Sequence, residues 1–249
     1  MTGPAWPWLE SVLAVLYLVF NEGFLASAGE AAVRRELCSE AIRRAAIVAD
    51  LMPDRPETHG LLALLCSRTR VGRRALGWMA RSRCWRNRTA PAGTAPRSAA
   101  ASGVLDRGFA AAARPSHAAV GHYLLQASIA AEHARTFDGR TTDWRAISTL
   151  YEALARIDPS PIVELNRAVA VAQADGPVDG PVAGLRLLDD LAARGELAAY
   201  HLLPAAWADL LRRLGRLPEA AAEYEHALAL CDNDAERRFL QRRLAETRS

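Results

Sequence analysis

The arrangement of small and large side chains near the C-terminus constrains the fold of this chain more than any other feature of its sequence. Ala208 and Ala220 stand on either side of Gly215, in two segments with helical periodicity. Small side chains let two antiparallel helices approach closely, and glycine accepts the left-handed turn that joins them. We expect Trp207 and Tyr224 to fill the space between this helix pair and its neighbour. Since one pair cannot bury its own apolar face, flanking helices must complete a stack.

The spacing of these residues, together with Leu211 and Ala227, resembles that of a tetratricopeptide repeat (TPR). An unrelated helical hairpin with an alanine-rich seam is the alternative, and the number of matched positions favours the repeat. Residues 166–191 look like a second, degenerate helix pair. The tetrapeptide Asp-Gly-Pro-Val occurs there twice in succession, at 175–178 and 179–182, and we expect it to lengthen the turn.

The rest of the chain predicts further helices and no sheet. Apolar side chains recur at helical spacing outside the middle of the sequence, and alanine, the best helix former, is abundant. The first segment is apolar almost all round, as in a helix buried on most sides, and Asn21-Glu22-Gly23 is expected to end it. The predicted helices span Leu9–Phe20, Gly29–Leu51, Pro56–Cys66, Tyr123–Ala134, Thr142–Ile157, Pro161–Ala174, Val182–Arg194, Leu203–Leu214 and Leu217–Leu230, and a last one begins after Asn233.

The middle of the chain departs from this pattern. Between Arg68 and Arg114 there are 11 Arg and one acid, Asp106, although the net charge of the whole chain is only +3. Contact with nucleic acid would explain such a basic stretch, but a solvated, poorly ordered segment is the simpler interpretation. We therefore predict an all-α fold of antiparallel helix pairs stacked as a TPR-like array. Its parts are an N-terminal helical part (1–66), an irregular Arg-rich segment (67–119) and the TPR-like array itself (120–249).

Several blocks outside this segment resemble the C-terminal extension of one group of extracytoplasmic-function (ECF) RNA polymerase sigma factors. Two are distinctive: the apolar run ending in Asn21-Glu22-Gly23, and Pro159-Ser160-Pro161 followed by Asn166-Arg167-Ala168. The blocks that continue the similarity are Glu30-Ala31, Pro56-Glu57-x-x-Gly60, Thr142-Asp143-Trp144, Arg213-Leu214-Gly215-Arg216 and Glu236-Arg237-Arg238-Phe239-Leu240.

The resemblance implies a cytoplasmic protein of bacterial type that takes part in transcription initiation. In that family two N-terminal sigma domains bind the core polymerase and the promoter, and this chain begins about where the second would end. We therefore expect a truncated or frameshifted copy without promoter-binding activity of its own. The expected protein partner is RNA polymerase, the sigma domains or an unknown regulator, and DNA would be contacted only through the missing domains. A free-standing TPR-like scaffold that binds proteins is the alternative function.

The sequence contains no pattern that predicts an enzyme, a cofactor site or a metal site. It has no phosphate-binding loop, dinucleotide fingerprint or H-E-x-x-H motif. His122 and His133 lie three helical turns apart on one predicted helix, about 16 Å, which is too far to share a metal ion. The four cysteines form no C-x-x-C pair, and the apolar run Val12–Phe20 is too short to span a membrane.

The candidate interaction or structural residues come from the blocks above. For Asn21-Glu22 and Asp143-Trp144, a cap or turn at a helix end is favoured over a partner site. Arg167 is expected to pair with an acid on an adjacent helix. The full set is Asn21, Glu22, Gly23, Asp143, Trp144, Asn166, Arg167, Trp207 and Tyr224.

We predict that the stretch from Ser67 to about Arg97 is translated out of frame, because acids vanish there while Arg, Pro, Trp and Cys increase together. When each triplet for Gly77–Ala95 starts on the wobble base of the preceding codon, one permitted translation is V-D-G-E-I-A-V-L-A-E-Q-D-R-A-R-W-D-R. This acidic segment resembles what the sigma-factor family carries at this place, and its Asp-Gly is fixed by the single codons of Trp78 and Met79. Sequencing the gene is the test, and a stop codon or no such segment in that frame would contradict the prediction.

Overall fold

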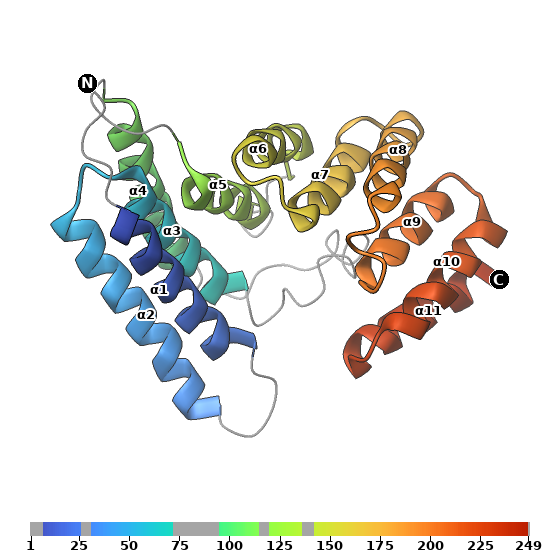
Figure 1. Ribbon diagram of the computed structural model, residues 1–249, viewed down its shortest axis with the longest axis horizontal. Coiled ribbons are helices and arrows are strands. Elements are labelled where there is room, and N and C mark those ends of the chain that lie inside the picture. The colour runs from blue at the N-terminus through green and yellow to red at the C-terminus, as the bar shows by residue number, and fades with distance from the viewer. Residues whose placement is uncertain (1–6, 26–30, 72–94, 115–119, 136–141, 249) are drawn as a thin grey trace. The chain divides into compact units, whose positions relative to one another are not determined.

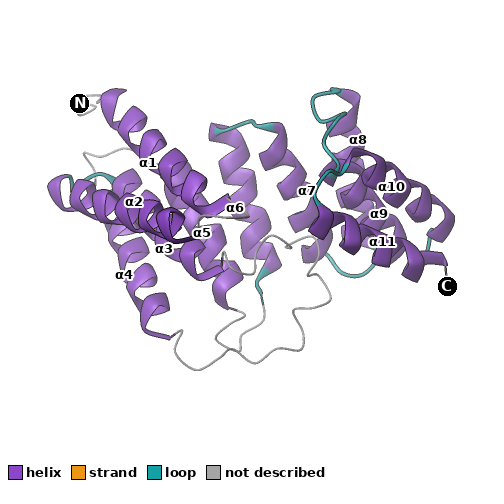
Figure 2. Cartoon of the chain, turned by 90° about the horizontal axis from the view of Figure 1, so that it is seen from below, coloured by secondary structure: helices purple, strands orange, loops and turns teal. Residues whose placement is uncertain are grey.

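Eleven α-helices make up the part of the chain that this computed structural model describes, which is residues 7–25, 31–71, 95–114, 120–135 and 142–248. No strand occurs in these ranges (Figure 2), as predicted. None of these helices is both long and apolar enough to cross a membrane. The helices are α1 (Pro7–Leu25), α2 (Ala31–Leu51), α3 (Pro56–Val71), α4 (Ala95–Ala112), α5 (His122–Arg135), α6 (Trp144–Ile157), α7 (Pro161–Ala174), α8 (Asp179–Ala193), α9 (Leu202–Arg213), α10 (Leu217–Leu230) and α11 (Asp234–Arg248) (Figure 1).

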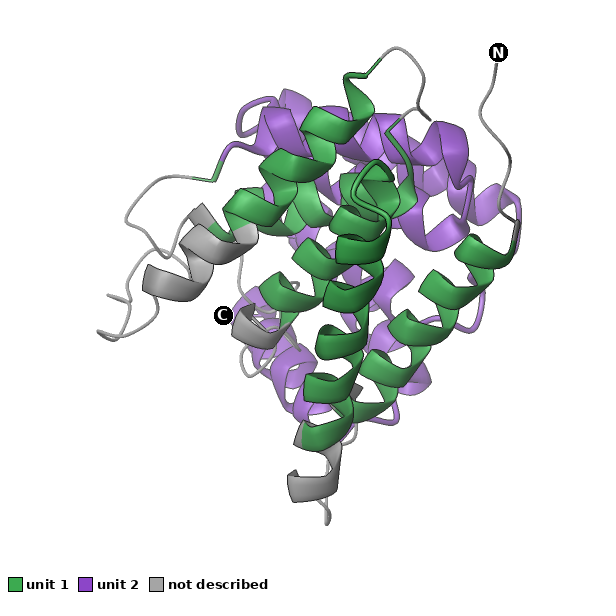
Figure 3. Cartoon of the chain, turned by 90° about the vertical axis from the view of Figure 1, so that its left-hand side faces the viewer, with its two compact units in different colours: residues 1–76, 89–142 green, residues 77–88, 143–249 purple. Residues whose placement is uncertain are grey.

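The described helices divide into two compact units (Figure 3), with α1 to α5 in the first and α6 to α11 in the second. In the first unit α3 is central, since it packs against α1, α2, α4 and α5. Residues 61–65 of α3 are all buried, so this helix is enclosed on every side. Phe20 of α1 and Ala45 of α2 complete the same apolar core.

Contact between α3 and α5 depends on Glu57 and Gly60. A Cβ at Gly60 would lie 2.5 Å from the backbone nitrogen of Leu124, so the two helices touch backbone to backbone. The Glu57 carboxylate accepts hydrogen bonds from the backbone N–H groups of Tyr123 (2.7 Å) and Leu124 (3.2 Å). Burial raises the pKa of Glu57, and these hydrogen bonds oppose that effect. The Pro56-Glu57-x-x-Gly60 block therefore fixes α5 on α3.

Neighbouring helices in the second unit pack in the order of the sequence, from α6 on α7 to α10 on α11. In the α9/α10 pair, Ala208 and Ala220 are fully buried, and Gly215 between the helices has a φ of +76°. Tyr224 is 2% exposed. The predicted pair and the flanking helices that complete its stack are therefore confirmed.

Two helices run past the points at which the sequence pattern predicted their ends. α1 continues through Asn21-Glu22-Gly23 to Leu25, and α3 continues beyond Cys66 to Val71. Arg68 of α3 donates from Nη1 to Asn21 Oδ1 (3.3 Å), and its guanidinium lies over the Tyr17 ring. Polar residues thus continue the contact between these helices after the apolar pattern has stopped, and tertiary packing outweighs the weak helix propensity of Asn21 and Gly23.

The Arg-rich segment predicted to be irregular over residues 67–119 contains more structure than expected. Besides the end of α3, it contributes α4, whose Val104 and Ala111 are buried in the first unit. Arg114, just after α4, pairs with Asp54 before α3. Alanine-rich sequence forms this helix without a conspicuous apolar period, which is why the pattern missed it. The core of the segment, residues 72–94 with Trp78, Cys84 and Trp85, lies outside the described residues.

The two copies of the duplicated tetrapeptide adopt different conformations. Asp175 to Val178 form the turn after α7, whereas Asp179 to Val182 form the first turn of α8. The second copy therefore lengthens the helix and not the turn. At the start of α7, Ser160 occupies the N-cap position and Pro161 is the first helical residue, but the Ser160 side chain makes no capping hydrogen bond.

Replacing Gly60 with alanine should destabilise the protein by about 1–3 kcal/mol, because the added methyl group meets backbone atoms of α5 that cannot move aside. Gly103 of α4 is the matched control, since a Cβ there meets no atom within 4 Å. Gly103→Ala should leave stability unchanged or raise it by up to about 1 kcal/mol. Urea denaturation measures both variants, and equal effects would contradict the proposed helix contact.

His133 of α5 should make stability depend on pH. Burial lowers the pKa of its imidazole from 6.5 to about 4. Between these values the unfolded chain holds a proton that the folded chain lacks, so stability falls as the pH drops from 6.5 to about 4, by at most about 3 kcal/mol.

His133→Gln removes this titration, so the variant should lose less stability than the wild type between pH 7 and pH 4.5 in urea denaturation. The difference should vanish above about pH 7.5, where His133 is neutral in both states. Parallel pH profiles of wild type and variant would show that His133 does not carry this dependence.

Candidate functional site

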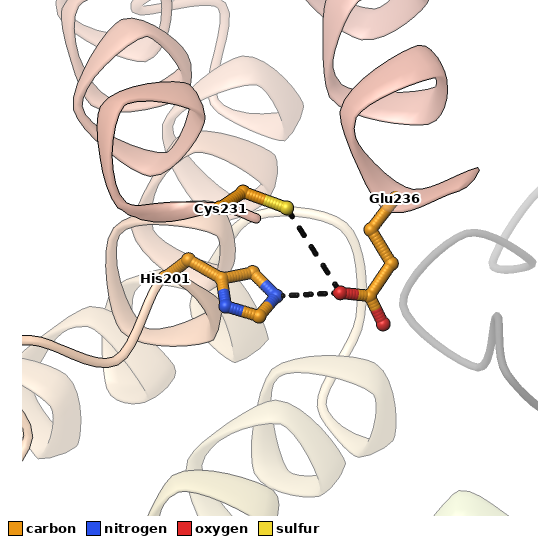
Figure 4. Close-up of side chains that lie close together, drawn as sticks. All are labelled: His201, Cys231 and Glu236. Carbon is orange, nitrogen blue, oxygen red and sulfur yellow. Dashed lines mark hydrogen bonds and ion pairs between the residues drawn. The ribbon is translucent and has the colours of Figure 1, made fainter. Parts of the chain in front are cut away.

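Side chains of three different metal-ligand types meet in the second unit (Figure 4). His201 directly precedes α9, Cys231 follows the last residue of α10, and Glu236 lies in the first turn of α11. Nε2 of His201 is 2.9 Å from Oε2 of Glu236, and Sγ of Cys231 is 4.0 Å from the same oxygen. The three ligand atoms lie within 4.8 Å of one another. Among the described residues, this is the group that could hold a metal ion.

The connection between α10 and α11 holds Cys231 and Glu236 in place. Asn233 caps α11, because its Oδ1 accepts hydrogen bonds from the backbone nitrogens of Ala235 (2.9 Å) and Glu236 (3.2 Å). Arg237 donates from Nη1 to the carbonyl oxygens of Leu228 (2.7 Å) and Cys231 (2.6 Å). These bonds satisfy carbonyl groups that the end of α10 leaves open.

Burial dominates the electrostatics of this group. Cys231 is 1% exposed, and its burial raises the pKa of its thiol; the nearby Glu236 carboxylate raises it further, while the hydrogen bond to the Asn233 backbone lowers it. Burial, followed by the charge of Glu236, also raises the pKa of Tyr200, whose ring contacts His201. The contact between His201 Nε2 and Glu236 is short, yet it lacks hydrogen-bond geometry, and the buried Nε2 has no hydrogen-bond partner.

A cysteine nucleophile activated by histidine does not fit this arrangement. Such a site pairs the imidazole with the thiol and lowers the pKa of the thiol. Here Nε2 of His201 faces Glu236, and the pKa of Cys231 is raised. His201 Nε2 and Cys231 Sγ both lie near the same Glu236 oxygen, so the group does not contain the histidine–thiol pair that activates a nucleophile.

The predicted candidates of the second unit have structural roles at separate places. Asp143 caps α6 by accepting a hydrogen bond from the Ala146 backbone nitrogen (2.9 Å), and Trp144 is the first residue of that helix. Arg167 pairs with Glu164 of its own helix, one turn away, and not with an adjacent helix as predicted. Asn166 beside it is partly buried.

Trp207 and Tyr224 link neighbouring helices. Trp207 of α9 donates from Nε1 to Asp189 Oδ1 of α8 (3.0 Å), and its ring packs on the core of α7, α8 and α9. Tyr224 packs in the apolar cluster that also contains Cys231. In the first unit, Asn21 accepts its hydrogen bond from Arg68, Glu22 is exposed and Gly23 is partly buried within α1. The structure does not gather the predicted candidates into one site.

Sequence reasoning missed the His201–Cys231–Glu236 group. The sequence pattern Asn233-x-x-Glu236 correctly predicted the start of α11, and a capping box would turn Glu236 back to Asn233. Instead, Oε2 of Glu236 faces His201 and Cys231. His201 lies 30 residues before Cys231 in the sequence, so no spacing rule connects them.

A second candidate surface lies on α1. The side chains of Trp8, Val12, Val15 and Leu18 are exposed on one face of this helix, whereas Leu9, Leu13, Leu16 and Phe20 are buried on the other. The prediction that α1 is buried on most sides is therefore wrong for the chain by itself. Its apolar outer face nevertheless has the composition of a buried surface.

Part of the chain, mostly in the first unit, matches a known protein family. Residues 8–78 match the family of unknown function DUF6596. The match includes the exposed face of α1, both residues of the Arg68–Asn21 contact, and Glu57 and Gly60, but not Tyr123 and Leu124, which these two residues contact. It extends past Ser67, the residue at which we expected the family pattern to fail, and ends within the stretch for which we predict a second reading frame.

One relative matches most of this chain. The chain is 36% identical over 244 residues to an uncharacterized protein, R00370, of Rhizobium meliloti (strain 1021). The alignment includes 95% of this chain and 53% of the relative, so the chain spans about half the length of the curated relative it matches. No solved structure matches the chain. These comparisons name no function, and the resemblance to sigma factors stays a prediction.

Proposed function

We propose that this chain is a protein-interaction domain equivalent to the C-terminal extension of an ECF-type sigma factor. In this proposal it acts in transcription initiation by binding protein, while the sigma domains of the intact protein contact DNA. Three observations support it: the sequence blocks that resemble that extension, the helical pairs of both units, and a relative that is about twice as long as the matched part.

The apolar outer face of α1 is the observation that carries the proposal. Val15 is 57% exposed and Leu18 is 64% exposed, and Val12 lies on the same face. A helix of a water-soluble domain normally turns charged residues to solvent, whereas this face is apolar from Trp8 to Leu18 apart from Ser11, which indicates a covering partner.

The occupant that we assign to this face is the part of the longer protein that this chain does not match. The relative has nearly as much sequence outside the alignment as inside it. In the sigma-factor interpretation that sequence contains the sigma domains, and docking them on α1 would bury its outer face. A free-standing scaffold would bind some other protein and would not bind the unmatched part of the relative. The two functions therefore predict different results in one binding experiment.

The double variant Val15→Glu/Leu18→Glu should weaken binding to the unmatched part of the R. meliloti relative about tenfold or more, because it places charges in an apolar contact. Isothermal titration calorimetry with the two purified polypeptides measures the affinity. Glutamate is a good helix former, so α1 itself should persist.

Val178→Glu is the control, since Val178 in the second unit is 59% exposed and receives the same kind of substitution, with one added charge. It should bind like the wild type. Transcription in vitro with core polymerase gives a second measurement: a polypeptide of these 249 residues should give no promoter-specific initiation, because none of the blocks that resemble the sigma-factor family belongs to its promoter-binding domains. Absence of wild-type binding, equal binding by the α1 variant, or initiation by the chain alone would each contradict the proposal.

A further inference from the structure

We propose that His201, Cys231 and Glu236 form a binding site for a divalent transition-metal ion, with Zn²⁺ as the ion that best suits the three donors. Imidazole nitrogen, thiolate sulfur and carboxylate oxygen are the ligands that Zn²⁺ takes in proteins. The inference is independent of the proposed interaction with sigma domains, because it concerns the second unit and not α1.

The separations of the donor atoms fit one ion. In a tetrahedral zinc site, ligand atoms at the usual bond lengths lie about 3.4–3.6 Å apart. The observed separations from Glu236 Oε2 are 2.9 Å to His201 Nε2 and 4.0 Å to Cys231 Sγ, and all three atoms lie within 4.8 Å of one another. In the proposed site, rotation of the three side chains brings the ligand atoms to the tetrahedral distances.

The orientation of the histidine distinguishes this group from an ordinary ion pair. Nε2 of His201 is buried and close to a carboxylate oxygen, yet the two do not have hydrogen-bond geometry. A buried polar atom without a partner is costly, and native structures rarely retain one without a reason. In a metal site the ligand atoms direct their lone pairs at a common third point and not at each other, which is consistent with the contact observed here.

The surroundings hold the ligands and leave one position open. Asn233 and Arg237 fix the backbone on both sides of the α10–α11 connection, as outer partners do in metal sites. The positive charge of Arg237 would repel a bound cation, but the hydrogen bonds of its guanidinium orient it towards backbone carbonyl groups. The two anionic ligands, a thiolate and a carboxylate, balance the charge of a divalent ion. Three protein ligands leave a fourth position for water or another ligand.

A bound ion would join the start of α9 to the connection between α10 and α11. These elements belong to the last helix pair and the helix that closes the stack. Metal binding should therefore raise the thermal stability of the folded chain, since the three ligands come together only in the folded state.

Cobalt(II) is the probe, because its visible spectrum reports tetrahedral geometry and its near-ultraviolet charge-transfer band reports a bound thiolate. The experiment uses the full chain with Cys38, Cys66 and Cys84 replaced by serine, so that Cys231 is the remaining thiol of the four. After treatment with a chelator, Co²⁺ is added to this variant and to the same variant with Cys231→Ser. Far-ultraviolet circular dichroism verifies that both remain folded.

We expect one equivalent of Co²⁺ to give the thiolate band in the variant that retains Cys231, and Zn²⁺ to displace it. Cys231→Ser should abolish the band, and His201→Gln or Glu236→Gln should weaken binding about 100-fold or more. His226→Gln, on an exposed histidine of α10, is the control and should bind as before. No thiolate band in the folded variant that retains Cys231, or binding unaffected by His201→Gln and Glu236→Gln, would overturn the proposal.

Discussion

Close approach of neighbouring helices at glycine and alanine is the constraint on which both units depend. Gly60 brings the backbone of α3 against α5, and only at this distance can Glu57 reach the N–H groups at the start of α5. In the second unit, a Cβ at Gly184 of α8 would lie 2.7 Å from the Ala172 side chain of α7. Ala208 and Ala220 play the same part between α9 and α10. Larger side chains at these positions would separate the helices and remove the contacts that depend on their spacing.

Sequence reasoning located most helices because helical periodicity and the residues that begin or end a helix can be recognised within a short stretch of sequence. Pro161, Gly215 and Asn233 act within a few residues of their own position, and the helices they delimit begin or end within one or two residues of the prediction. The same reasoning failed at Asn21 and Arg68, whose helices continue because these residues meet across 47 positions of sequence. It also missed α4, whose alanine-rich sequence gives no strong pattern until packing selects one face.

The candidate site could not be predicted, because its residues become neighbours only through the stack. Cys231 and Glu236 lie at opposite ends of one short connection, but His201 comes from the loop before α9 and reaches them only when α9 and α10 pack together. The outer face of α1 presents the reverse case. Its sequence predicted burial, and the described chain leaves Val15 and Leu18 exposed. A local pattern can thus indicate that a surface is covered without indicating by what.

The two copies of Asp-Gly-Pro-Val show how such a stack tolerates a change in chain length. Identical tetrapeptides form a turn and a helix start, so the position relative to α7 decides the conformation. Gly180 and Pro181 are buried, with Gly180 against Ala172, whereas Gly176 and Pro177 are exposed. Four residues add close to one helical turn. The insertion therefore hardly rotates α8, and Leu185, Leu188 and Leu191 keep the same face towards α7 and α9. At this connection, a four-residue insertion or deletion preserves the helical phase, which gives the chain a place to vary in length while the pair packing stays constant.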